Sequence, residues 1–181
     1  MVQETPNLIP FPQTAQTQQM LVRDALALGC EKAKIIQTRH ISVGHWVQLQ
    51  CQYGCKHFGK LFTCPPCSPS SSETAEILAD YDKALLIQAH EGSNPIEIGL
   101  ALEKSFKHKG FYKAFALNSR PCNLCETCSI DTFCKYPEKA RPTLQACGID
   151  LNQTLLANNW EGTGPISPCS ESSNIGLILL H

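Results

Sequence analysis

The sequence predicts an α/β domain with a mixed sheet of about four or five strands and helices packed on it. Three observations predict this class. Apolar residues recur at helical spacing from Thr17 to Leu28, short apolar runs typical of buried strands lie at Ala84–Ala89 and Ile175–Leu180, and the two kinds of segment alternate along the chain. A chain of 181 residues is long enough to bury a real core. We therefore expect one compact domain over residues 17–181, after a loose arm at 1–16.

The first third of the chain predicts one helix, two strands and an irregular loop. Gly29 suits the stop of the first helix. Ala33–Gln37 is a predicted strand, and Ser42–Gln50 alternates well enough to be another that delivers Cys51 at its end. Residues 51–72 hold four cysteines, three prolines and two glycines without periodicity. The shape of this loop must come from what it binds.

Two later helices have specific start signals. Ser70, with a glutamate three residues on, predicts a capping box and a helix to Asp80. Asn94 followed by Pro95 predicts a second helix, which Gly110 would end.

The last third predicts a strand and two short helices around a second cysteine-rich loop. A strand at Phe111–Leu117 leads into this loop, at residues 120–137. Beyond the loop, Arg141-Pro142 and Asp150 each can open a short helix, and the apolar run near the end is expected to be a central strand. Metal-binding loops are thus expected at the ends of strands.

The composition excludes several classes of protein. A formal net charge of -1 and a pI near 6.6 give no basic field for nucleic acid. No run of 18 apolar residues and no apolar leader appear, so we expect a cytoplasmic protein that does not enter a membrane. Eleven cysteines without a secretion signal indicate metal ligation or redox chemistry, because cytosolic reductants oppose disulfides.

The second cysteine-rich loop carries the strongest signal. Cys122, Cys125 and Cys128 follow one another at x2 spacing, and Cys134 comes five residues later. This triple matches the start of the bacterial ferredoxin run, whereas structural zinc sites usually pair two separated knuckles. The end departs from the ferredoxin run, in which the last cysteine follows x3. The spacing predicts a four-thiolate [4Fe-4S] site, with Cys134 as the fourth ligand.

The first cysteine-rich loop offers four more thiols: Cys51-x3-Cys55-x8-Cys64-Pro-Pro-Cys67. Alone, this spacing also suits tetrahedral zinc. A chain with one cluster often carries a second, which favours a second [4Fe-4S] site. The two prolines favour an extended segment of about 9 Å between its cysteines. The fourth ligand is therefore Cys67, an exchangeable group or a distant thiol such as Cys147.

With both motifs in this order, the chain resembles a prokaryotic family of predicted metal-binding proteins of unknown function. The resemblance covers roughly residues 20–160 and includes the Pro137–Pro142 and Cys147–Asp150 segments. It implies metal binding, through iron–sulfur centres, without a known reaction. It carries seven residues over as ligands: Cys51, Cys55, Cys64, Cys122, Cys125, Cys128 and Cys134. Cys67 departs from the family pattern, which has an aromatic residue there.

The sequence thus predicts a protein with two [4Fe-4S] clusters that acts in electron transfer or cluster-dependent redox chemistry, with a redox protein as a possible partner. One alternative is an enzyme whose N-terminal cluster has only three cysteine ligands and one open iron. The other is a zinc-stabilised interaction module with no redox role. The oligomeric state has no signal in the sequence.

Overall fold

The computed structural model describes residues 14–162 and 174–181. Most of the arm expected at 1–16 therefore lies outside the described residues. The first helix, α1 (Ala15–Ala27), begins two residues earlier than predicted, because the Thr14 hydroxyl accepts a hydrogen bond from the Thr17 N–H and caps it. Among the described residues, no helix is both long and apolar enough to cross a membrane.

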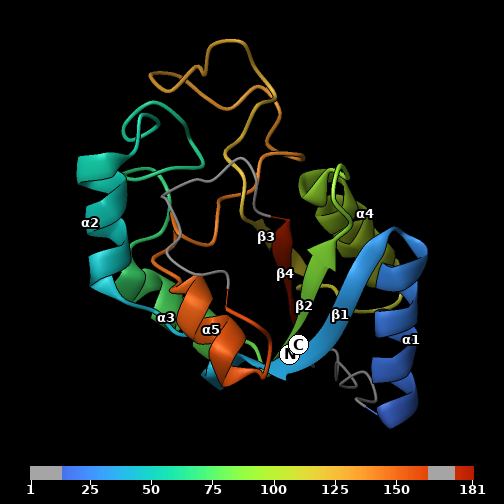
Figure 1. Ribbon diagram of the computed structural model, residues 1–181. Coiled ribbons are helices and arrows are strands. Elements are labelled where there is room, and N and C mark those ends of the chain that lie inside the picture. The colour runs from blue at the N-terminus through green and yellow to red at the C-terminus, as the bar shows by residue number, and fades with distance from the viewer. Residues whose placement is uncertain (1–13, 163–173) are drawn as a thin grey trace, which may run out of the picture.

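One sheet of four strands organises the chain (Figure 1). Its order is β1-β2-β4-β3, and all three pairings are antiparallel, where a mixed sheet was predicted. The α/β class and the central position of the last strand are confirmed. The strands are β1 (Cys30–Gln37), β2 (Lys83–Ala89), β3 (Phe115–Asn118) and β4 (Ile175–Leu180).

Helices and loops cover both faces of the sheet, because alternate residues of its strands point to opposite sides. Leu85 and Ile87 of β2 pack with α1 and α4 (Pro95–His108) on the first face. Ala84 and Leu86 pack on the second face, with α3 (Ser71–Ala79), α5 (Leu151–Ala157) and the segment between β3 and α5. Both cysteine-rich loops project on the side of the second face (Figure 1).

The capping predictions are confirmed. Ser70 and Glu73 form both hydrogen bonds of the capping box at α3. Asn94 accepts from the Ile96 N–H at the start of α4, with Pro95 in the first turn. Asp150 accepts from the Gln153 N–H at the start of α5.

The predicted strand at Ser42–Gln50 is wrong. Most of it belongs to a helix, α2 (His45–Gly54), which carries Cys51 in its last turn. Val47 and Cys51 lie four residues apart on the buried side, while Trp46 and Leu49 are about half exposed. Apolar residues on both sides of this helix mimic the alternation of a strand.

Two predictions after α4 also need correction. The predicted strand at Phe111–Leu117 begins only at Phe115, because residues 111–114 form a turn closed by the Ala114 N–H on the Phe111 carbonyl. No helix opens at Arg141-Pro142. The backbone there returns to the end of β3, where the Leu144 N–H donates to the Asn118 carbonyl.

Candidate metal centre

The second cysteine-rich loop leaves the sheet at the end of β3 and comes back to the same place. Residues 119–142 contain no helix or strand. Asn118 pairs with Thr143 in an isolated parallel bridge, and the Ser119 hydroxyl donates to the Ile175 carbonyl at 2.7 Å. Both ends of the loop are therefore held on the sheet, and the loop between them has no regular backbone structure.

The four cysteines of this loop line one cavity: Cys122, Cys125, Cys128 and Cys134. All four are free, half-buried thiols. No Asp, Glu or His is among the described residues that line the cavity, so the cysteine sulfurs are its strongest metal donors. Thiolates without carboxylates select zinc or iron–sulfur clusters over hard cations such as Mg²⁺.

The electrostatics of Cys122 include the influence of the other three thiols of this loop. Burial raises the pKa of the Cys122 thiol above its usual value of 9.0, the Leu124 N–H lowers it, and the other three thiols raise it again. A thiol with a raised pKa stays protonated near neutral pH, and a bound metal ion would stabilise its thiolate form. The donor set of this cavity therefore fits a metal centre.

The metal would complete the shape of this site. Across residues 14–162 and 174–181, no three His, Cys, Asp or Glu side chains are gathered closely enough to hold one metal ion. The free volume among the four thiols is about 20 Å³, roughly that of a single water-sized sphere. A loop without helix or strand can open to admit a larger group, and it gains order when its ligands bind.

A buried ion pair anchors the end of this loop. The Arg141 guanidinium donates two hydrogen bonds to the Glu103 carboxylate of α4, at 2.8 and 2.7 Å, and lies over the Phe115 ring. Glu103, which is 3% exposed, also accepts from Lys107 and from the Ala116 N–H. Burial raises the pKa of the Glu103 carboxyl group, but the hydrogen-bond partners lower it by more, so the net pKa lies below the usual 4.5.

The first cysteine-rich loop begins inside α2. Cys51 is 2% exposed and its thiol donates to the Gln145 carbonyl at 3.9 Å. Cys55 follows directly after the helix, and Cys64 is as deeply buried as Cys51. Helix α2 therefore holds the first two predicted ligands in its last turn and just beyond it, where a strand was expected.

The segment between Cys64 and Cys67 is a turn, so the extended span of about 9 Å predicted from the prolines is wrong. The Cys67 N–H donates to the Cys64 carbonyl at 3.0 Å, and the Pro65–Pro66 peptide is cis. A hydrogen-bonded four-residue turn keeps its end α-carbons within about 7 Å. The two cysteines are thus close along the backbone, but Cys64 is buried and Cys67 is exposed.

The two cysteine-rich loops meet. Leu61, Phe62 and Thr63 of the first loop line the cavity that holds the four cysteines of the second. Cys134 also borders a second, larger cavity, together with Cys67 and Cys147. Burial raises the pKa of the Cys147 thiol to about 12, despite a hydrogen-bonding effect of the nearby Thr74 hydroxyl that lowers it.

Comparison with known proteins agrees with the cysteine pattern. Residues 34–180 match the model of a family described as predicted metal-binding protein (DUF2284). The chain belongs to this family. No curated protein and no solved structure matches it. Metal binding by this protein is thus supported by the family.

The structure also reveals residues that the sequence does not single out. Thr63, Thr74 and Gln145 are buried polar residues whose side chains make no hydrogen bond of standard geometry. The two threonines line the larger cavity. No motif marks them, because their neighbours come from segments far apart in the sequence.

Proposed function

We propose that this protein binds two [4Fe-4S] clusters and acts in electron transfer. One observation carries the proposal: four cysteines, three of them at ferredoxin-like spacing, line one cavity whose described lining has no carboxylate and no imidazole. A cluster there would be held by Cys122, Cys125, Cys128 and Cys134. When bound, it would supply a one-electron redox centre.

The surroundings of this loop suit a redox partner protein. The side chain of Phe133 is 72% exposed and that of Tyr136 is 41% exposed, so aromatic groups flank Cys134 at the surface. Exposed aromatic residues are typical of protein contact sites. The second cluster is proposed at Cys51, Cys55, Cys64 and Cys67, where the turn brings the last two cysteines close along the chain.

Metal analysis tests the proposal directly. Protein purified without air is expected to be brown and to contain about eight iron and eight acid-labile sulfide per chain, since each cubane holds four of each. The measurement is iron, sulfide and zinc content on the same sample. Stoichiometric zinc without sulfide would contradict the proposal and leave the zinc-stabilised interaction module.

The exposure of Cys67 favours a second candidate, an enzyme with an open-site cluster on Cys51, Cys55 and Cys64. Three thiolate ligands leave one iron free to bind substrate. The variant Cys67→Ala separates the candidates. If Cys67 is a ligand, as we expect, iron content falls by up to about four per chain or the paramagnetic spectrum of the reduced protein changes.

Cys30→Ala is the matched control for this variant. Cys30 is also a free cysteine, but it is buried on the first face of the sheet among apolar side chains. Its replacement should leave the iron content unchanged. An unaltered cluster in the Cys67 variant would reject Cys67 as a ligand and favour the open-site enzyme.

A further inference from the structure

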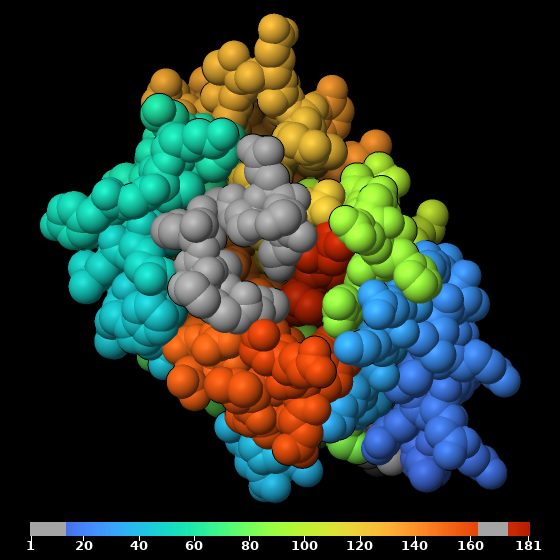
Figure 2. Space-filling view, viewed as in Figure 1, coloured from blue at the N-terminus to red at the C-terminus, as the bar shows by residue number. Residues whose placement is uncertain are grey.

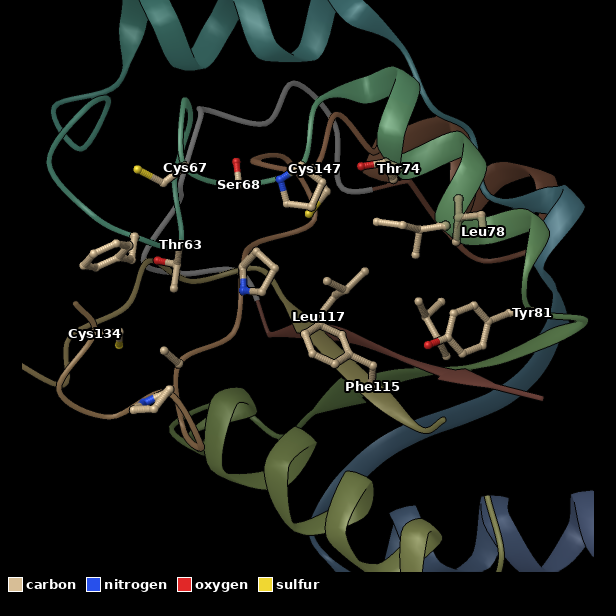
Figure 3. A pocket seen from close by; sticks show the side chains of 17 residues that line it. Thr63, Cys67, Ser68, Thr74, Leu78, Tyr81, Phe115, Leu117, Cys134 and Cys147 are labelled. Carbon is tan, nitrogen blue, oxygen red and sulfur yellow. The ribbon is translucent and has the colours of Figure 1, made fainter. Parts of the chain in front are cut away.

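A cavity of about 460 Å³ lies between the two cysteine-rich loops, on the second face of the sheet (Figure 3). Leu117 and Leu179 contribute from the sheet, Leu78 from α3, and Pro142 from the end of the second loop. Small-molecule sites in proteins usually have about 300–1,000 Å³. An engineered cavity of about 150 Å³ binds benzene, so this one has room for a compound of two fused rings.

The lining of the cavity is uncharged. None of the described residues that line it is Asp, Glu, Lys, Arg or His, and aromatic, aliphatic and proline side chains dominate. Burying a charge without a partner is very costly, so this cavity selects against ions.

Some polar groups of the cavity already have partners. The Tyr81 hydroxyl donates to the Lys113 carbonyl at 3.0 Å, and the Ser68 hydroxyl donates to the Ala146 carbonyl at 2.9 Å. The hydroxyls of Thr74 and Thr63 have no hydrogen-bond partner of standard geometry, although these residues are only 3% and 5% exposed, and the Thr74 hydroxyl interacts with the Cys147 thiol. Sulfur is a weak hydrogen-bond partner, so a ligand oxygen would be a stronger one for Thr74.

Thr74 is the better placed of these two hydroxyls. Figure 3 shows its oxygen on the side that faces Cys147, between α3 and the cavity wall. Thr63 also lines the smaller cavity of the four cysteines, so it belongs to the border of the metal centre. A hydroxyl group both donates and accepts hydrogen bonds, so Thr74 can bind either a ligand hydroxyl or a ligand carbonyl.

We propose that this cavity binds an uncharged compound of one or two fused rings that carries a single hydroxyl or carbonyl group, which hydrogen-bonds to Thr74. The site goes beyond the proposed cluster chemistry, and two of the predicted metal ligands, Cys67 and Cys134, form part of its walls. The ligand would contact the wall formed by Cys134, and it would therefore lie beside the predicted C-terminal metal centre.

The test uses 2-naphthol and naphthalene as probes, in equilibrium dialysis against anaerobically purified full-length protein. The two probes differ by one hydroxyl group. We expect saturable binding of 2-naphthol with a dissociation constant near or below about 100 µM. Thr74→Val keeps the shape of the side chain and removes its hydroxyl. This variant should weaken the binding of 2-naphthol about fivefold to tenfold and change the binding of naphthalene by no more than about twofold.

Two further variants make the result specific. Thr63→Val, the matched control, should change binding of either probe by less than about twofold, and Thr74→Ser should keep 2-naphthol binding. No saturable binding of 2-naphthol by the folded wild-type protein would overturn the proposal, as would equal effects of the two valine variants. The metal content of each sample is measured separately, so failure of this proposal and failure of the cluster proposal are distinguishable.

Discussion

Replacing Cys125 by serine is expected to remove one of the two clusters. Iron and sulfide should fall from about eight to about four per chain, because a serine hydroxyl is a poor substitute for a thiolate. The loop around Cys125 contains no helix or strand, and its four thiols repel one another when ionised. Loss of the metal should therefore unfold residues 119–142 together, which faster amide hydrogen exchange in this segment would show.

The same measurement on Cys30→Ala is the control for this result. Cys30 is 3% exposed, and burial raises its pKa to about 11, so it packs as a neutral thiol on the opposite face of the sheet. Its variant should lose some packing energy while retaining iron and the protection of residues 119–142. Full iron content and an unchanged melting temperature in Cys125→Ser would show that Cys125 is not a ligand.

The second large effect is expected at Arg141. Arg141→Met should lower the free energy of unfolding by about 3 kcal/mol, because it leaves the Glu103 carboxylate buried without its main partner. Glu103 is 3% exposed and accepts two hydrogen bonds from this guanidinium. The measurement is urea-induced unfolding of the wild type and the variant at neutral pH.

Lys107→Met serves as the comparison, because Lys107 contacts the same carboxylate from an exposed position. The Lys107 side chain is 43% exposed, whereas that of Arg141 is 10% exposed. Exposed ion pairs contribute little, so this variant should cost less than about 1 kcal/mol. If both variants cost the same, the buried guanidinium does not anchor the second cysteine-rich loop.

The sequence predicts those elements whose signals are local. The Ser70 capping box and the Asn94-Pro95 start lie within a few residues of the helices that they begin, and both are confirmed. The helix over His45–Gly54 was missed because Trp46 and Leu49 remain exposed in the fold, so its apolar pattern follows no single face. The spacing of apolar residues predicts a helix or a strand only where these residues are buried, so it misleads where apolar side chains stay at the surface.

The candidate site likewise has one part that the sequence predicts and one part that it does not. The spacing of Cys122, Cys125 and Cys128 is a local signal, and the structure brings these thiols to one cavity with Cys134. The apolar cavity beside them leaves no pattern in the sequence, since its walls come from α3, the sheet and both cysteine-rich loops. Thr74 becomes a candidate only when its neighbours in space are known (Figure 3).

Cys134 forms part of the walls of both cavities. The second cysteine-rich loop, which carries Cys134, lies at the top of the molecule as drawn, beside the first cysteine-rich loop (Figure 2). With Cys134 as a predicted metal ligand, occupation of one cavity changes the surroundings of the other. Thermodynamic linkage makes such coupling reciprocal. If bound metal changes the affinity for an organic ligand by some factor, the bound ligand changes the affinity for the metal by the same factor. A molecule bound against Cys134 would then act as an effector of metal retention.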